Sequence, residues 1–427
     1  MTMHGEHRCR TGKAATGLGG GGGNALLLAM SDDDLDGTGG RPHVRTLVSA
    51  TGANVIFHLI FALPSVLVIT RFLWPLPWPV GVKLVIADLM LVASQFQYWS
   101  KLSSGSIFAP EFPRAVILLF NWASGAILFL ALMQLLADVV LLVLWMVPGG
   151  ARVMAVELRY CMAAGAAMLA AVAVFNATRV PSLKDVEIGI AGLPPQFDGY
   201  TLVQLTDLHI SRLFPAAWTR AVVDRTNALD VDLIVVTGDV IDGSLAMRRA
   251  DVEPLRDLRA RDGVYMSPGN HEYFLGYQEW MRHFAGMGMH LLANRHVVLE
   301  KNGGHVVLAG VTDVTAPATG MPPPDLAAAL DGAPTGMPIL LLDHQPGPAR
   351  KAASRGVALQ LSGHTHGGMM PGLDRLVAMG NDGFVSGLYA VDGMTLYVNN
   401  GTGIWPGFAM RLGRPAELTR ITLRRKV

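Results

Sequence analysis

Five short polar motifs follow five apolar runs, in the same order, along the C-terminal half of the chain. The runs are short enough to be buried strands, and they are Tyr200–Leu205, Leu233–Thr237, Val264–Ser267, Ile339–Leu342 and Val357–Leu361. The motifs are Asp207-Leu-His209, Gly238-Asp239-Val-Ile-Asp242, Gly269-Asn270-His271-Glu272, Asp343-His344 and Gly363-His364-Thr365-His366. Because open α/β sheets place their chemistry at strand ends, we expect these motifs to meet in one site.

The motifs supply aspartate, histidine and asparagine, with no thiolate among them. This mixture suits borderline divalent ions such as Mn, Fe or Zn better than Ca or Mg. A lone aspartate at a strand end is more often a turn former or helix cap than a ligand. Five such motifs in order predict a two-metal centre, and therefore a dinuclear metallohydrolase.

The motif series resembles the calcineurin-like metallophosphoesterase superfamily, whose pattern is D-x-H, G-D-x-x-D, G-N-H-[DE], H and G-H-x-H. The resemblance covers roughly residues 183–427. Three further segments resemble the bacterial YkuE-like branch of membrane-associated members: Gly387-Leu388-Tyr389, Asn400-Gly401-Thr402-Gly403 and Arg411-Leu412-Gly413. Met369 stands where relatives often carry glutamine, and because of this departure the resemblance does not determine which substrate is preferred.

The resemblance implies a set of ligand residues for each of two divalent ions. Asp207, His209 and His366 are expected to hold the first ion; Asn270, His344 and His364 the second; and Asp239 is expected to bridge them. Such a pair implies hydrolysis of a phosphate ester by attack of a metal-bridged hydroxide.

Three further residues receive roles beside the metals. The resemblance places His271 at the leaving-group oxygen as general acid or charge stabiliser, and Asp242 as the group that orients a histidine or a water. Arg411 is expected either to bind the substrate phosphate or to form a structural salt bridge.

For Asp343 two roles remain open: it supports a ligand, or it accepts a structural hydrogen bond. Four histidines outside the motifs are interpreted as surface or packing residues: His283, His290, His296 and His305.

The apolar residues, 51% of the chain, concentrate in residues 51–176. Four segments there approach the roughly 20 residues that a membrane span needs: Thr51–Thr70, Val80–Trp99, Ala115–Val147 and Val153–Phe175. Tryptophans near the span ends fit an interfacial belt. We expect four transmembrane helices, or three if Val80–Trp99 is only interfacial; a buried soluble helical domain is the alternative. Asp88 and Asp138 within these segments indicate either an ion pathway or pairing between helices.

The remaining sequence predicts three regions. Residues 1–48 are glycine-rich and acidic and are expected to be a disordered tail, residues 49–178 a transmembrane helical region, and residues 179–427 the metallophosphoesterase domain. Alternating strands and helices followed by antiparallel strands indicate an α/β sandwich, with two mixed sheets flanked by helices. Asn302-Gly303-Gly304 predicts a hairpin turn.

Charge limits the partners of this domain. Residues 180–427 hold 22 Lys and Arg against 24 Asp and Glu, so no nucleic-acid partner is expected. The two cysteines predict no disulfide. The expected substrate is a phosphorylated small molecule or a lipid-linked phosphate at the membrane. Alternatives are a pyrophosphatase of a nucleotide-linked lipid precursor, like the UDP-diacylglucosamine hydrolases of the superfamily, and a membrane sensor or transporter with a non-catalytic domain.

Lys and Arg near the span ends predict orientation. With four spans, six of these Lys and Arg residues lie on the side of the N-terminus and four lie on the other side. This bias predicts an integral protein of the bacterial inner membrane with a cytoplasmic catalytic domain. Some relatives resembling YkuE are exported, and a three-span count would reverse the answer.

Overall fold

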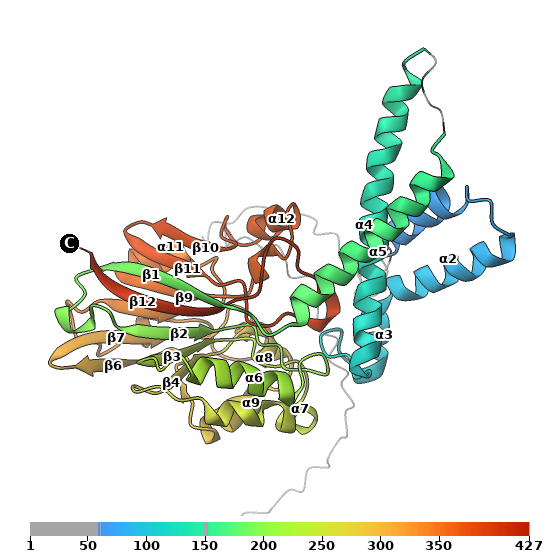
Figure 1. Ribbon diagram of the computed structural model, residues 1–427. Helices are drawn as coiled ribbons and strands as arrows, with labels where there is room; N and C mark the ends of the chain where they lie inside the picture. Colours follow the sequence, from blue (N-terminus) through green and yellow to red (C-terminus); the bar gives the residue numbers. More distant parts are fainter. Residues whose placement is uncertain (1–58, 60, 149, 151–152, 427) are drawn as a thin grey trace, which may run out of the picture.

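The computed structural model describes residues 59, 61–148, 150 and 153–426, and the N-terminal tail lies outside this part. Two six-stranded sheets form the C-terminal half (Figure 1). The first has the order β1-β12-β2-β3-β4-β5, with β1 Leu183–Ala191, β2 Thr201–Leu205, β3 Leu233–Thr237, β4 Val264–Ser267, β5 His290–Leu291 and β12 Leu418–Lys426. The second has the order β10-β11-β9-β8-β7-β6, with β6 Arg295–Lys301, β7 Gly304–Gly310, β8 Ile339–Leu342, β9 Val357–Ser362, β10 Gly387–Val391 and β11 Met394–Val398.

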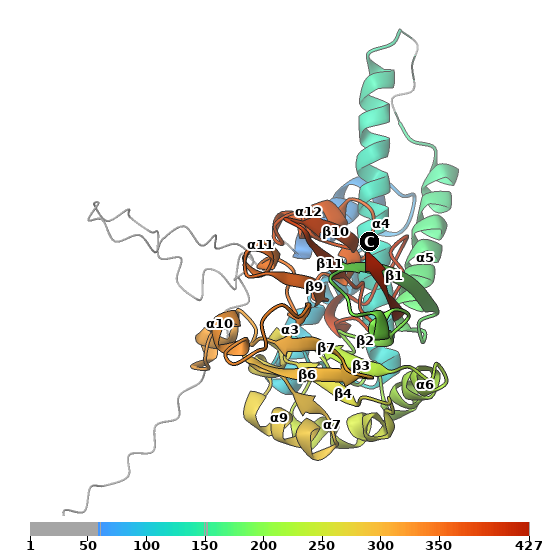
Figure 2. The same cartoon turned by 90° about the vertical axis from the view of Figure 1, so that its left-hand side faces the viewer.

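The two sheets pack face to face, because each presents an apolar face to the other. Leu202, Leu233 and Val235 of the first sheet lie in one core cluster with Leu340 and Leu361 of the second. The outer faces carry helices, as Figure 2 shows from the end of the sandwich. These helices are α6 Ala216–Asn227, α7 Leu245–Val252, α9 Tyr277–Gly286, α10 Leu326–Ala329 and α11 Ala349–Ser354. α8 Asn270–Phe274 carries residues of the third motif, and α12 Leu373–Met379 lies against the 3-10 turn His366–Gly368. The expected α/β sandwich of two mixed sheets is confirmed.

The pairing of the last strands differs in part from the expected antiparallel end of the chain. β10 and β11 form an antiparallel hairpin, but β11 runs parallel to β9. β12 crosses back to the first sheet, where it is antiparallel to β2 and parallel to β1. β1 and β12 pair along nine residues each, from Leu183↔Leu418 to Ala191↔Lys426. The first and last strands of the domain therefore lie side by side at one edge of the first sheet.

The N-terminal half is helical, and two helices are long and apolar enough to cross a membrane within the described residues. These are α4 Arg114–Trp145 and α5 Val156–Thr178, which form an antiparallel pair rising from the sandwich (Figure 1). α2 Val80–Ser94 and α3 Phe96–Ser104 are bent by 57° and would add a third span if they act as one. The expected span Thr51–Thr70 lies partly outside the described residues. Within the described part, the structure has a shorter apolar helix, Phe61–Leu73. The count of four therefore stays a prediction.

Asp88 and Asp138, the two acids of the expected spans, differ in their surroundings. Asp138 on α4 accepts hydrogen bonds from Arg71 at 3.1 and 3.2 Å and from Gln134 at 2.8 Å. This geometry matches the alternative of pairing between helices. Asp88 is exposed on α2.

Candidate metal centre

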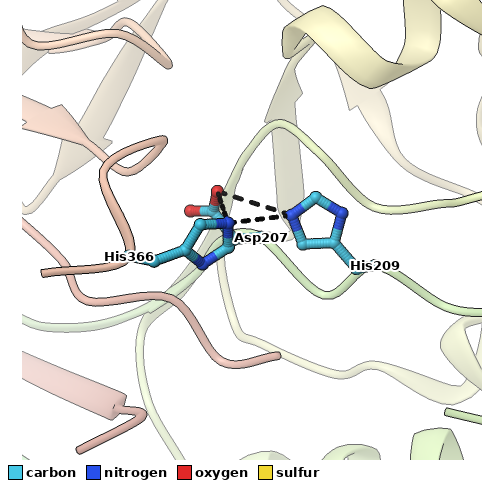
Figure 3. Close-up of side chains that lie close together, drawn as sticks. All are labelled: Asp207, His209 and His366. Atoms are coloured by element: carbon cyan, nitrogen blue, oxygen red, sulfur yellow. Dashed lines mark hydrogen bonds and ion pairs between the residues drawn. The ribbon is translucent and has the colours of Figure 1, made fainter. Parts of the chain in front are cut away.

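The five motifs meet at one edge of the sandwich, at the ends of β2, β3, β4, β8 and β9. Asp207, His209 and His366 converge first, and each turns a ligand atom toward the others (Figure 3). The Nε2 atoms of the two histidines lie 3.2 Å apart, and they lie 3.9 and 3.7 Å from Asp207 Oδ1. Two imidazole nitrogens that each lie about 2.1 Å from one ion would have a similar separation. The donor set therefore fits a divalent metal ion.

A second group lies beside the first and contains Asp239, His344 and His364. His344 Nδ1 donates to the Thr237 carbonyl at 2.7 Å, which leaves its Nε2 facing Asp239 Oδ2 at 3.2 Å. That buried Nε2 atom makes no hydrogen bond within the described part of the chain. An orphaned imidazole nitrogen aimed at a carboxylate is what a missing cation would satisfy.

Asn270 joins the second group, and Asp239 lies between the two. The Asn270 side-chain oxygen is 3.0 Å from His364 Nδ1. Asp239 Oδ2 is 3.2 Å from His344 Nε2 and 3.9 Å from His209 Nε2. The structure thus brings together all seven expected ligands, with Asp239 placed where a bridging carboxylate would be.

Asp242 and His271 occupy the positions next to this centre. The Asp242 carboxylate accepts from His209 Nδ1 at 3.1 Å and from His271 Nδ1 at 2.5 Å. These contacts fix both rings so that the Nε2 atoms face the site, and His271 Nε2 is 3.9 Å from Asp239 Oδ2. Burial disfavours charge on His271, but the carboxylates of Asp239 and Asp242 raise its pKa to about 9.

Two of the expected histidine ligands have lowered pKa values, which favours their neutral form. Burial, with the nearby His344 adding to it, lowers the pKa of His364 to about 3. Burial, together with His209 and Arg411, also holds the pKa of His366 well below its ordinary value. Neutral imidazoles keep a free lone pair, which is the form that binds a metal ion.

The backbone at the site is unusual. Five of the seven expected ligands have positive φ: Asp207 at 52°, His209 at 45°, Asp239 at 53°, His364 at 67° and His366 at 50°. Gly238 also has a positive φ of 81°, and a Cβ there would lie 2.4 Å from the Gly269 nitrogen. Only glycine permits the close approach of the β3 and β4 ends.

Arg411 is placed differently from a phosphate-binding residue. Its side chain is completely buried, and its guanidinium donates to the carbonyls of His366, Asn400, Gly403 and Arg414 at 2.6–3.3 Å. Burial lowers its pKa to about 10. This geometry favours the structural alternative, although backbone carbonyls take the place of the expected salt-bridge carboxylate.

The sequence analysis gave no role to Glu272, although it is in the third motif. Its buried carboxylate accepts from the backbone N–H groups of Asp239, Val240 and Gly269 at 3.0, 2.7 and 2.8 Å. It thereby ties the turn after β3 to the turn after β4. An acid following the histidine in the motif was the available signal, but its partners are distant in sequence.

The remaining residues that were left open lie around the centre. Asp343 is buried beside His344, its backbone carbonyl accepts from Ser362 Oγ at 2.6 Å, and burial raises its pKa to about 8. Of the four histidines outside the motifs, His296 donates from Nδ1 to the Ala329 carbonyl at 2.7 Å. None of the four belongs to a metal-ligand cluster of the described residues.

Comparisons with known proteins show which family the chain resembles. Residues 200–368 match the family model described as calcineurin-like phosphoesterase. A zebrafish (Danio rerio) protein named "Transmembrane protein with metallophosphoesterase domain" is 36% identical over 270 residues, 60% of this chain and 61% of that protein. The metallophosphoesterase YkuE of Bacillus subtilis is 30% identical over 239 residues, 54% of this chain and 82% of YkuE. A metallophosphoesterase of Helicobacter pylori is 31% identical over 245 residues, 57% of this chain and 64% of that protein. The chain spans about three fifths of the first two curated relatives.

Proposed function

This chain belongs to the calcineurin-like phosphoesterase family, and from that premise we propose that it is a membrane-anchored phosphoesterase that uses two divalent metal ions. The observation that carries the proposal is the convergence of two ligand groups on Asp239. Asp207, His209 and His366 hold one ion, and Asn270, His344 and His364 hold the other. Ions bound there supply Lewis-acid activation of water and of phosphoryl oxygens.

The other residues act on the substrate and on the ligands. His271 is buried with its Nε2 toward the site, and the carboxylates of Asp239 and Asp242 raise its pKa, so it is suited to give a proton to the leaving oxygen of the ester. Asp242 holds His271 and His209 in the required orientation through both Nδ1 atoms. Arg411 keeps the backbone of His366 in place through its carbonyl contact at 2.9 Å.

The donor set supports a borderline divalent metal ion. The first ion would have one carboxylate and two imidazoles as ligands, and the second an amide and two imidazoles. The carboxylate of Asp239 would be shared by both. Such ligands suit Mn, Fe or Zn. The two apolar helices and the transmembrane relative indicate membrane association. We propose an inner-membrane location with the catalytic domain in the cytoplasm, on the charge bias of the sequence.

The test is a hydrolysis screen of the full chain purified in detergent and loaded with Mn. Phosphomonoesters, phosphodiesters and lipid pyrophosphates are the three substrate classes, and Asp239→Asn is the matched inactive control. We expect phosphate ester hydrolysis by the wild type alone. Turnover of lipid pyrophosphates in place of esters would favour the pyrophosphatase alternative, and metal binding without turnover of any class would favour a sensor.

A further inference from the structure

A loop of the membrane half reaches the side chain of His271. This loop, residues 105–113 between α3 and α4, carries Phe108, whose ring centroid lies 4.9 Å from that of His271 in an edge-to-face arrangement. Phe108 also stacks on Phe274 at 5.2 Å and lies 5.7 Å from Trp405. Phe108, Phe274 and Trp405 together are called the aromatic wall below.

The loop is fastened to the catalytic domain by charged contacts. Glu111 accepts from Arg212 at 2.9 Å and forms an ion pair with the completely buried Arg248. Arg114, at the start of α4, donates to the Leu213 carbonyl at 2.9 Å. A buried, paired arginine is costly to separate from its carboxylate, so Phe108 is held in a fixed place beside His271.

The opposite side of the aromatic wall is fastened to the membrane helices as well. Asn121 of α4 donates to the Pro406 carbonyl at 2.9 Å and accepts from the Ala409 N–H at 2.6 Å. Gln97 of α3 donates to the Gly407 carbonyl at 3.2 Å. The segment that carries Trp405 is therefore positioned by α3 and α4, and the wall is built from both halves of the chain.

Two features indicate that the wall receives a ligand. Phe274 is 43% exposed although it stacks on Phe108, so an apolar face next to His271 stays open. The indole Nε1 of Trp405 is buried and has no hydrogen-bond partner among the described residues. Aromatic residues with a free polar end suit a ligand that is apolar with a polar head.

We propose that the aromatic wall is the subsite for the apolar leaving group of a membrane lipid phosphate ester. The proposal rests on the proposed function, because His271 then lies at the leaving oxygen and its neighbours contact the group that departs. The wall adjoins α3 and α4, whose outer residues are apolar and exposed, as Leu102 and Leu119 show at 62% and 58%.

The experiment compares two soluble esters of similar length, hexyl phosphate and the phosphate ester of diethylene glycol monomethyl ether. The readout is the ratio of kcat/KM for the apolar over the polar ester, measured on the Mn-loaded full chain. Phe108→Ala is expected to lower this ratio by roughly 10-fold, as the loss of an apolar contact does. Phe274→Ala should lower it similarly, and Phe108→Leu should retain most of it. Ile107→Ala, a truncation of the adjacent loop residue, is the matched control and should leave the ratio unchanged.

A second arm tests the membrane as the source. Dodecyl phosphate carried in phosphatidylcholine vesicles should be hydrolysed by the wild type, and Phe108→Ala should slow it by the same factor. If hydrolysis of the free hexyl ester depends on Phe108 but hydrolysis of dodecyl phosphate in vesicles does not, the proposal that the substrate comes from a membrane is overturned. If Phe108→Ala does not fold, Phe274→Ala and Phe108→Leu decide the question.

Two outcomes separate the subsite from the proposed function. A wild type that hydrolyses both soluble esters, with a ratio that no wall variant changes, overturns the subsite while the phosphoesterase assignment stands. An equal loss for both esters in Phe108→Ala also overturns it, because the loop would then only support the fold. A wild type that hydrolyses no phosphate ester of any class overturns the proposed function instead.

Discussion

Five of the seven proposed ligand residues occupy backbone conformations that L-amino acids rarely adopt. Asp207, His209, Asp239, His364 and His366 all have φ between 45° and 67°, and such a residue costs about 1–2 kcal/mol relative to a right-handed conformation. Hydrogen bonds hold the strained turns, as when the His364 N–H donates to both carboxylate oxygens of Asp207 at 3.1 Å. Strain concentrated in one place is typical of functional sites.

The bridging position of Asp239 gives the first prediction. Asp239→Asn removes the negative charge that both ions would share, so the variant should lose bound metal and nearly all turnover. Elemental analysis and phosphate release measure the two effects. Asp392→Asn is the control, because Asp392 has a similar φ of 47° in an exposed hairpin turn away from the site. Two ions per chain and normal turnover in Asp239→Asn would refute the bridge.

His271 separates chemistry from metal binding. His271→Gln should retain the metals, because this ring contacts Asp242 and approaches Asp239 without belonging to either ligand set proposed above. Its rate should fall roughly 10²–10⁴-fold, as expected when a general acid is removed. His305→Gln, outside the motifs, should be unaffected in both measurements. Loss of metal from His271→Gln would show that this histidine is a ligand.

At the scale of elements, the site depends on the register between the ends of β3 and β4. Glu272 maintains it by accepting three backbone N–H groups from the two turns. Glu272→Gln keeps the shape but turns an amide NH2 toward backbone donors, so the turns should separate. Metal affinity should fall by about 10–100-fold, as for other residues that support ligands.

Metal titration of the stripped protein, followed by calorimetry, measures this affinity. Glu279→Gln on the exposed side of α9 is the matched control. An unchanged affinity in Glu272→Gln would mean that the turns are fixed by the glycines alone.

The sequence predicted the parts of the fold whose signals are local. The strands of the five motifs and the hairpin at Asn302-Gly303 occur as expected. The parallel pairing of β1 with β12 was missed, because it joins residues more than two hundred positions apart and leaves no local pattern.

In the candidate site, too, the sequence predicted what depends on local motifs and missed what depends on contacts between distant residues. Ligand types and their order were readable, because each motif follows its own strand. The environment of Arg411 was not readable, since burial and four carbonyl partners arise from loops distant in sequence. The contact of Phe108 with His271 was missed for the same reason: 163 positions separate the two residues in the chain.

At the scale of the whole molecule, the membrane half and the catalytic half form one structure. α4 leaves the sandwich and α5 returns to it (Figure 1), and the N–H of Arg411 donates to the Ala173 carbonyl of α5 at 3.0 Å. Arg71 pairs with Asp138 near the other end of α4. The start of α4 and the end of α5 therefore lie on the side of the catalytic domain.

Orientation is the prediction at this scale. The excess of Lys and Arg on the side of the catalytic domain predicts a cytoplasmic C-terminus. A C-terminal GFP fusion should fluoresce, and a C-terminal alkaline phosphatase fusion should be inactive. Both fusions are best made in the Asp239→Asn background, so that phosphatase activity of the chain itself does not contribute. Strong alkaline phosphatase activity without fluorescence would place the domain in the periplasm.

Metal dependence tests the central claim most directly. The full chain in detergent is stripped with a chelator, its metal content is measured, and phosphate release from an ester is followed as Mn is added back. The account predicts that activity disappears on stripping and returns to a plateau at two ions per chain, and that Asp239→Asn shows no recovery. Ester hydrolysis that persists in the metal-free protein would contradict it.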